Sequence, residues 1–250
     1  MSKTELYLDK PMLNAPGSLG FSPDLKGPID FSIFGAFVTN PVSWEPRYPA
    51  SGTRYLPFPG GFLVHTGHPN PGLRTVIQQH ARRWANSPLP IIIHLLAQDA
   101  YVVEKMVRHL EGLDGIVGVA ISLPPEIDVD SAYTLTTAAL GELAVIIQLP
   151  FERARLLAEK LESLGINAFS IAPPRGILQD SDGFLVTGRY YGPSIFPLAL
   201  NCVKNIIPIG IPIIGGGGIY TKKDLEIMLD TGAIGVFVDT VLWRDPIFKI

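Results

Sequence analysis

The stretch IPIIGGGGIYTKKD, residues 211–224, organises the whole chain: an apolar run enters four glycines and leaves into a helix start. Thr221 followed by Asp224 approximates a capping box, which marks the first turn of a helix. Glycines allow a ligand close to the backbone, and a helix N-terminus presents unpaired N–H groups. The stretch therefore predicts a phosphate site, with a tight turn that binds nothing as the alternative.

The composition favours a soluble domain with a large core. The chain has 250 residues, of which 47% are hydrophobic and 17% charged, and its net charge is −3. This balance argues against a nucleic-acid partner. The start, Met1–Glu5, lacks the apolar region of a signal peptide, and no apolar run approaches the about 18 residues of a membrane span. We expect a cytoplasmic protein without a membrane segment, and its single cysteine, Cys202, excludes an internal disulfide.

Short apolar runs alternate with helical patterns from end to end. The expected strands are rich in Ile and Val and apolar on both faces, as in a parallel sheet covered by helices: 12–15, 33–39, 91–95, 116–121, 144–149, 168–171, 212–215 and 235–238. The expected helices are 73–84, 100–111, 131–141, 151–164, 195–206 and 222–230. This alternation is typical of an α/β fold, either a doubly wound sheet or a barrel. The strand count and the late glycine turn favour one (β/α)8 TIM barrel domain spanning residues 1–250.

Two segments depart from the alternation, residues 41–71 and 172–194. Both follow expected strands, so both belong at the C-terminal face of the barrel, where barrel enzymes carry their active sites. Long loops in a compact domain tend to be functional.

An ordered set of motifs resembles the dihydroorotate dehydrogenases, flavin mononucleotide (FMN) enzymes built on this barrel. The matching stretches cover almost the whole chain: PMLNAPG at 11–17, GAFVT at 35–39, GHPNPG at 67–72, the stretch 192–200 and the four glycines. The resemblance implies an oxidoreductase and FMN contacts at equivalent positions. These are Ala15, Gly17, Asn40, Gln148, Gly192, Gly216, Gly217 and Thr240.

Several positions depart from the family pattern. The resemblance implies a catalytic base at position 123, where this chain has Leu123, which cannot accept a proton. It also implies two lysines at positions where this chain has Asn40 and Gln148. Four asparagines that hold orotate become residues without hydrogen-bonding side chains, namely Val64, Ala120, Pro125 and Ala172. Each unpaired polar edge of a buried ligand costs about 1–3 kcal/mol. We therefore expect a substrate other than dihydroorotate. Asp239 stands where the family has glycine, and a carboxylate there would repel a phosphate.

Three histidines are candidates for the missing acid–base chemistry: His65, His68 and His94. Histidine titrates near neutral pH, although a lone histidine is more often structural. Their spacing does not predict a metal site. In the second long segment, Arg175, Arg189, Tyr190 and Tyr191 are either a clamp for an anionic substrate or part of a solvated hairpin.

Three hypotheses remain open from the sequence. The first is an FMN oxidoreductase acting on a small molecule. The second is a flavin-free barrel that binds another phosphate ligand, as a lyase or isomerase. The third is a non-catalytic scaffold or partner subunit. A homodimer is compatible with each of them.

Overall fold

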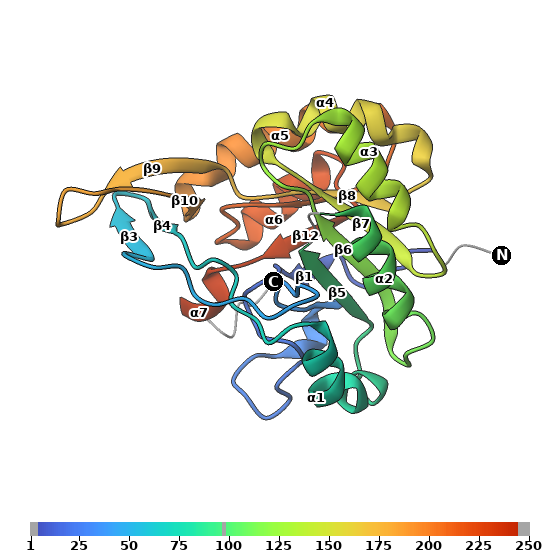
Figure 1. The fold of residues 1–250 in the computed structure, drawn as a ribbon. Helices are drawn as coiled ribbons and strands as arrows, with labels where there is room; N and C mark the ends of the chain where they lie inside the picture. The colour runs from blue at the N-terminus through green and yellow to red at the C-terminus, as the bar shows by residue number, and fades with distance from the viewer. Residues whose placement is uncertain (1–4, 97–98, 245–250) are drawn as a thin grey trace.

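The computed structural model describes residues 5–96 and 99–244. Residues 1–4, part of the stretch that predicted no signal peptide, lie outside this range. Eight parallel strands form one sheet in the order β1-β12-β11-β8-β7-β6-β5-β2 (Figure 1). Their bounds are Met12–Asn14 (β1), Phe37–Val38 (β2), Ile91–Leu96 (β5), Ile116–Ser122 (β6), Ala144–Leu149 (β7), Ala168–Ile171 (β8), Ile213–Gly216 (β11) and Gly235–Val238 (β12). The (β/α)8 TIM barrel predicted from the sequence is confirmed.

The barrel closes between its first two strands. A parallel bridge joins Leu13 to Ala36, and the side chain of Asn14 completes the seam. Its oxygen accepts from the Val38 N–H at 2.9 Å, and its nitrogen donates to the Val38 carbonyl at 2.7 Å. Asn14 is 1% exposed, so these bonds satisfy backbone groups of β2 that no strand partner reaches. Strand β2 is shorter than the predicted 33–39, and residue 33 belongs instead to a 3₁₀ turn over residues 31–33.

Two apolar layers hold the barrel together. Inside it, ten buried residues from all eight strands pack together, among them Leu13, Ile92, Ile146 and Phe237. A larger cluster fills the space between the strands and the helices outside them. The helices are Leu73–Ala85 (α1), Ala100–Leu110 (α2), Val129–Ala138 (α3), Ala154–Leu161 (α4), Phe196–Ile206 (α5), Lys222–Asp230 (α6) and Val241–Arg244 (α7). Among the described residues, no helix has the length and apolar character to cross a bilayer.

The two irregular segments form a second sheet that the sequence did not predict. Strands β3 (Tyr55–Phe58) and β4 (Gly61–Val64) come from the first segment, and β9 (Arg175–Gln179) and β10 (Leu185–Tyr191) from the second. They pair antiparallel in the order β3-β4-β10-β9 and project to one side of the barrel (Figure 1). The β4–β10 pairing carries residues that follow barrel strands β2 and β8 to one place at the barrel mouth.

Candidate functional site

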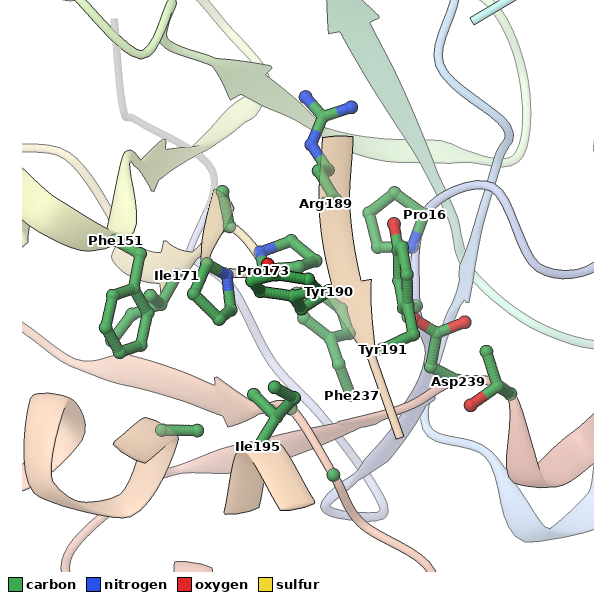
Figure 2. A pocket seen from close by; sticks show the side chains of 18 of the residues that line it. Pro16, Phe151, Ile171, Pro173, Arg189, Tyr190, Tyr191, Ile195, Phe237 and Asp239 are labelled. Atoms are coloured by element: carbon green, nitrogen blue, oxygen red, sulfur yellow. The ribbon is translucent and has the colours of Figure 1, made fainter. Parts of the chain in front are cut away.

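A cleft lies at the C-terminal ends of the barrel strands, where β10 passes over the barrel mouth (Figure 2). It comprises about 840 Å³ of space, counting its open mouth. Its lining comes from several barrel strands, from the glycine stretch and from β10. The two halves of the cleft differ in construction.

The glycine half presents backbone donors. Among residues 5–96 and 99–244, the N–H groups of Gly217, Gly218 and Thr240 have no hydrogen-bond partner, and all three residues line the cleft. Gly217 has φ +105°, and a Cβ added there would lie 3.0 Å from the Cβ of Ala199. Only glycine therefore fits this turn without strain or displacement.

Helix α6 begins as the sequence predicted. Thr221 accepts from the Asp224 N–H at 3.2 Å, and the Asp224 carboxylate accepts from the Thr221 N–H at 2.8 Å. The capping box thus occupies donors of the first turn within the protein, so the glycines, not the helix end, supply the open N–H groups. Lys222 and Lys223 are exposed and do not line the cleft.

A carboxylate lies in the same half. Asp239 is half-buried, lines the cleft and has no cation within 4.0 Å among the described residues. Burial raises the pKa of Asp239 to about 7. Beside it, the Tyr220 hydroxyl and the Thr240 hydroxyl share a hydrogen bond of 2.7 Å.

Gln148 and Ser122 form the polar floor of the cleft. They face one another across strands β7 and β6, and the Ser122 hydroxyl donates to the Gln148 carboxamide oxygen at 2.8 Å. Both side chains are at least 92% buried. The carboxamide oxygen of Gln148 is engaged, whereas its NH₂ group has no hydrogen-bond partner among the described residues, and Gln148 lines the cleft.

The other half of the cleft carries a cation. Arg189 of β10 is half-buried, lines the cleft and contacts His68 Nε2 through its Nη1. The only ion pairs among the described residues are three exposed pairs within helices, so Arg189 has no acidic partner there. Burial lowers the pKa of Arg189. His68 has φ +53°, the only described non-glycine residue with positive φ.

His94 lies on β5 at the inner end of this half. It is 2% exposed, and its Nδ1 atom has no hydrogen-bond partner within the described part of the chain. Burial and then the charge of Arg189 lower the pKa values of His94 and His68 to about 3, so both rings are neutral near pH 7. Two neutral imidazoles and one guanidinium therefore meet at this end.

The structure brings together most of the residues named from the sequence. Ala15, Gln148, Gly192, Gly216, Gly217 and Thr240 line the cleft, as do His68, His94, Arg189, Tyr190 and Tyr191. Four of the expected contact or acid–base residues are not among its lining, namely His65, Gly17, Asn40 and Arg175. The lining also excludes four positions where the family pattern is lost, Leu123, Val64, Ala120 and Pro125. His65 faces a separate surface groove with Asp180. The Asn40 side chain accepts from the Gly20 N–H at 3.0 Å and so fixes an N-terminal loop.

Sequence reasoning missed the apolar walls of the cleft. They include Pro16, Phe151, Ile171, Pro173, Pro174 and Phe237 (Figure 2). Three of these, Ile171, Pro173 and Pro174, lie at the end of β8 and the start of the second irregular segment. Their position next to this long segment is the one feature of the sequence that could have indicated a role in the cleft.

Comparisons with known proteins agree with the fold and the motifs. No protein-family model matches the chain. It is 28% identical over 264 residues to the catalytic subunit of dihydroorotate dehydrogenase B (NAD(+)) from Bacillus mycoides (strain KBAB4), covering 96% of this chain and 85% of that protein. The same figures hold for the subunit from Bacillus cereus (strain AH187).

Two solved structures share the fold. Ligand-free DHODH from Eimeria tenella superposes with a TM-score of 0.78 at 16% identity, covering 98% of this chain and 84% of that one. The ferulenol complex of DHODH from the same organism gives 0.73 at 17% identity, covering 95% and 78%. The resemblance read from the sequence motifs is confirmed.

Proposed function

We propose that this relative of the dihydroorotate dehydrogenases is an FMN-dependent oxidoreductase whose substrate is not dihydroorotate. The named relatives are catalytic subunits of a dehydrogenase and align along 96% of the chain, which supports oxidoreductase chemistry here. The observation that carries the cofactor is the set of open N–H groups on Gly217, Gly218 and Thr240 in one cleft with Gln148.

The residues present fit a flavin phosphate in the glycine half. Backbone N–H groups that converge on one place form an anion site without any side-chain charge. The positive φ values of Gly217 and Gly218 keep the turn open to a ligand. Charged hydrogen bonds contribute about 1.5–3 kcal/mol each, so two or three such donors outweigh one opposing carboxylate.

Gln148 fits the polar edge of a flavin ring. Its NH₂ group is a donor suited to a carbonyl oxygen, and the bond from Ser122 holds it in one orientation. It supplies no positive charge, unlike the lysine that the family resemblance implies at this position. When bound, FMN supplies hydride acceptance, and the chain's own residues orient it and exclude water.

The proposal that the protein does not oxidise dihydroorotate rests on Leu123. Its side chain is 4% exposed and packs in the apolar layer, so no group at this position removes a proton. The residues at the four asparagine positions, Val64 among them, offer no side-chain hydrogen bonds. His94 lines the cleft, but the lowered pKa of its ring makes it a weak proton acceptor near pH 7, so we assign no replacement base.

One observation favours a flavin-free alternative. Asp239 brings a carboxyl group to the same half of the cleft as the open N–H groups. An ionised carboxylate opposes any phosphate, so a barrel that binds an uncharged or singly charged ligand there is the second candidate.

Absorbance of the purified protein tests the proposal. We expect the spectrum of bound flavin, either as isolated or after loading with FMN and gel filtration, and no oxidation of dihydroorotate by the loaded protein. Dihydroorotate turnover would contradict the reading of Leu123. A colourless protein after loading would contradict the cofactor and favour the alternative.

A further inference from the structure

One end of the cleft carries a cation with no anion to balance it. The guanidinium of Arg189 contacts only His68, and its remaining N–H donors have no partner among the described residues. A cation removed from water and left without a partner is unfavourable, and such groups occur where a ligand completes the site.

The groups around Arg189 do not supply the missing negative charge. Arg47 and Arg175 lie close enough to His68 to act on it electrostatically, and both add charge of the same sign. Asp239 is in the other half of the cleft, with Tyr191 between it and Arg189 (Figure 2). This end of the cleft is therefore positive.

The two histidines extend the unpartnered polar surface. His68 occupies the left-handed backbone region, held by a bond from its N–H to Thr66 and by Asn70, which donates to its carbonyl. A non-glycine residue at this φ costs about 1–2 kcal/mol, and these two bonds help to hold the backbone there. The unpartnered Nδ1 of His94 adds a second site for a polar atom.

The cleft lining at the end of β8 is apolar, and it meets β10 where the Pro174 carbonyl accepts from the Tyr190 N–H at 2.9 Å. Pro173, Pro174 and Ile171 line the cleft, and Phe151 lies beyond them. A polar ring would leave its edges unpaired against this lining.

We propose that Arg189, with His68 and His94, binds the carboxylate of a substrate whose remaining body is apolar. A planar guanidinium matches a carboxylate with two parallel hydrogen bonds, and the proline and isoleucine walls accept the rest. That this acid is a substrate rests on the proposed oxidoreductase function. The acid-binding site itself does not depend on flavin.

Calorimetry on the full chain tests this site, with and without loaded FMN. The probes are cinnamate and hexanoate, each beside its primary amide, which has the same shape without the charge, and orotate. We expect the acids to bind more tightly than the amides and than orotate. Arg189→Gln should weaken acid binding about 10- to 100-fold, the loss of a charge-assisted bond.

Matched variants separate charge from position. Arg175→Gln removes a cation from the cross-strand partner of Arg189, outside the cleft lining, and should leave acid affinity within about twofold. Arg189→Lys keeps the charge without the fork and should bind at an intermediate strength. Circular dichroism confirms that each variant is folded.

Several outcomes would overturn the site: acids and amides that bind alike, no binding by any probe, orotate as the tightest ligand, or equal losses in Arg189→Gln and Arg175→Gln. These outcomes are independent of the cofactor. A chain that retains no FMN but still prefers the acids through Arg189 refutes the proposed function and sustains this inference.

Discussion

The two halves of the cleft recognise charge by different means. The glycine half uses backbone N–H groups at the ends of β11 and β12, both part of the continuous barrel. The arginine half uses His94 of barrel strand β5 together with side chains from β10 and the loop before α1, which the second sheet brings to the barrel mouth. Backbone donors are fixed by the barrel, whereas the arginine half exists only because β4 pairs with β10.

The two halves also balance charge differently. Asp239 and Arg189 each lack a partner of opposite charge among the described residues. Asp239 can lose its charge by binding a proton, because burial raises its pKa to about 7. Arg189 keeps its charge in the working range of pH even with a lowered pKa. Asp239 can therefore become neutral when an anion binds, whereas Arg189 stays charged and is stabilised by an anionic ligand.

The largest expected effect is a loss of FMN affinity from a substitution in the glycine half alone. Gly217→Val should reduce FMN affinity more than about 100-fold, because a β-branched residue at φ +105° moves the open N–H groups and meets Ala199. Equilibrium dialysis measures the affinity.

Gly210→Val is the matched control for backbone strain. Gly210 has φ +91° with no atom within 4 Å of an added Cβ, and it lies outside the cleft lining. It should lose stability to a similar degree while retaining FMN. Equal FMN uptake by Gly217→Val and the wild type would remove the phosphate site from this turn.

The next effect depends on pH. Above pH 7 the wild-type Asp239 is ionised and opposes an anion, so its FMN affinity relative to Asp239→Asn should fall about tenfold between pH 6 and pH 8. Dialysis at both values gives the ratio, and Asp230→Asn, at an exposed position of α6, serves as the control. A ratio that does not change with pH would show that the carboxyl group points away from the bound phosphate.

The same group changes stability with a defined sign. Its folded pKa of about 7 lies above the ordinary value of 3.8 for an aspartate. Burying the charged form therefore costs free energy that is absent below about pH 4, grows up to pH 7 and is constant above. Urea unfolding should therefore show Asp239→Asn gaining more over the wild type at pH 8 than at pH 5.

Arg189 should give a smaller change without pH dependence. Arg189→Met removes an unpaired desolvated charge and keeps the apolar stem, so we expect the free energy of unfolding to rise by about 1–2 kcal/mol. The gain should be the same at pH 5 and pH 8, unlike that of Asp239→Asn. Destabilisation by Arg189→Met would mean that the contact with His68 supports the fold.

The contrast explains which features the sequence revealed. The barrel strands are local apolar runs, and four of the expected segments, 144–149, 168–171, 222–230 and 235–238, match the structure at both ends. The glycine turn and its capping box are also local, so both were visible within one stretch. Local patterns were sufficient for the barrel and its glycine half.

The arginine half of the cleft could not be predicted from local sequence patterns. Arg189, His68 and His94 come from three separate segments, and their meeting depends on the β4–β10 pairing, which no short pattern encodes. The same non-locality explains why His65 was grouped with His68. Although only two residues lie between them, the structure places His65 at a surface groove and His68 in the cleft.

The smallest expected effect is a change in the free energy of unfolding at His68, and it separates the role of the backbone there from that of the ring. Asparagine tolerates the left-handed region that valine avoids, so His68→Asn should change the free energy of unfolding by less than about 1 kcal/mol, whereas His68→Val should cost about 1–2 kcal/mol. Urea unfolding measures both. Because both variants remove the imidazole, they should weaken cinnamate binding to a similar degree despite their different stabilities. If acid affinity instead follows stability across the pair, the backbone at His68, and not its ring, shapes the arginine half of the cleft.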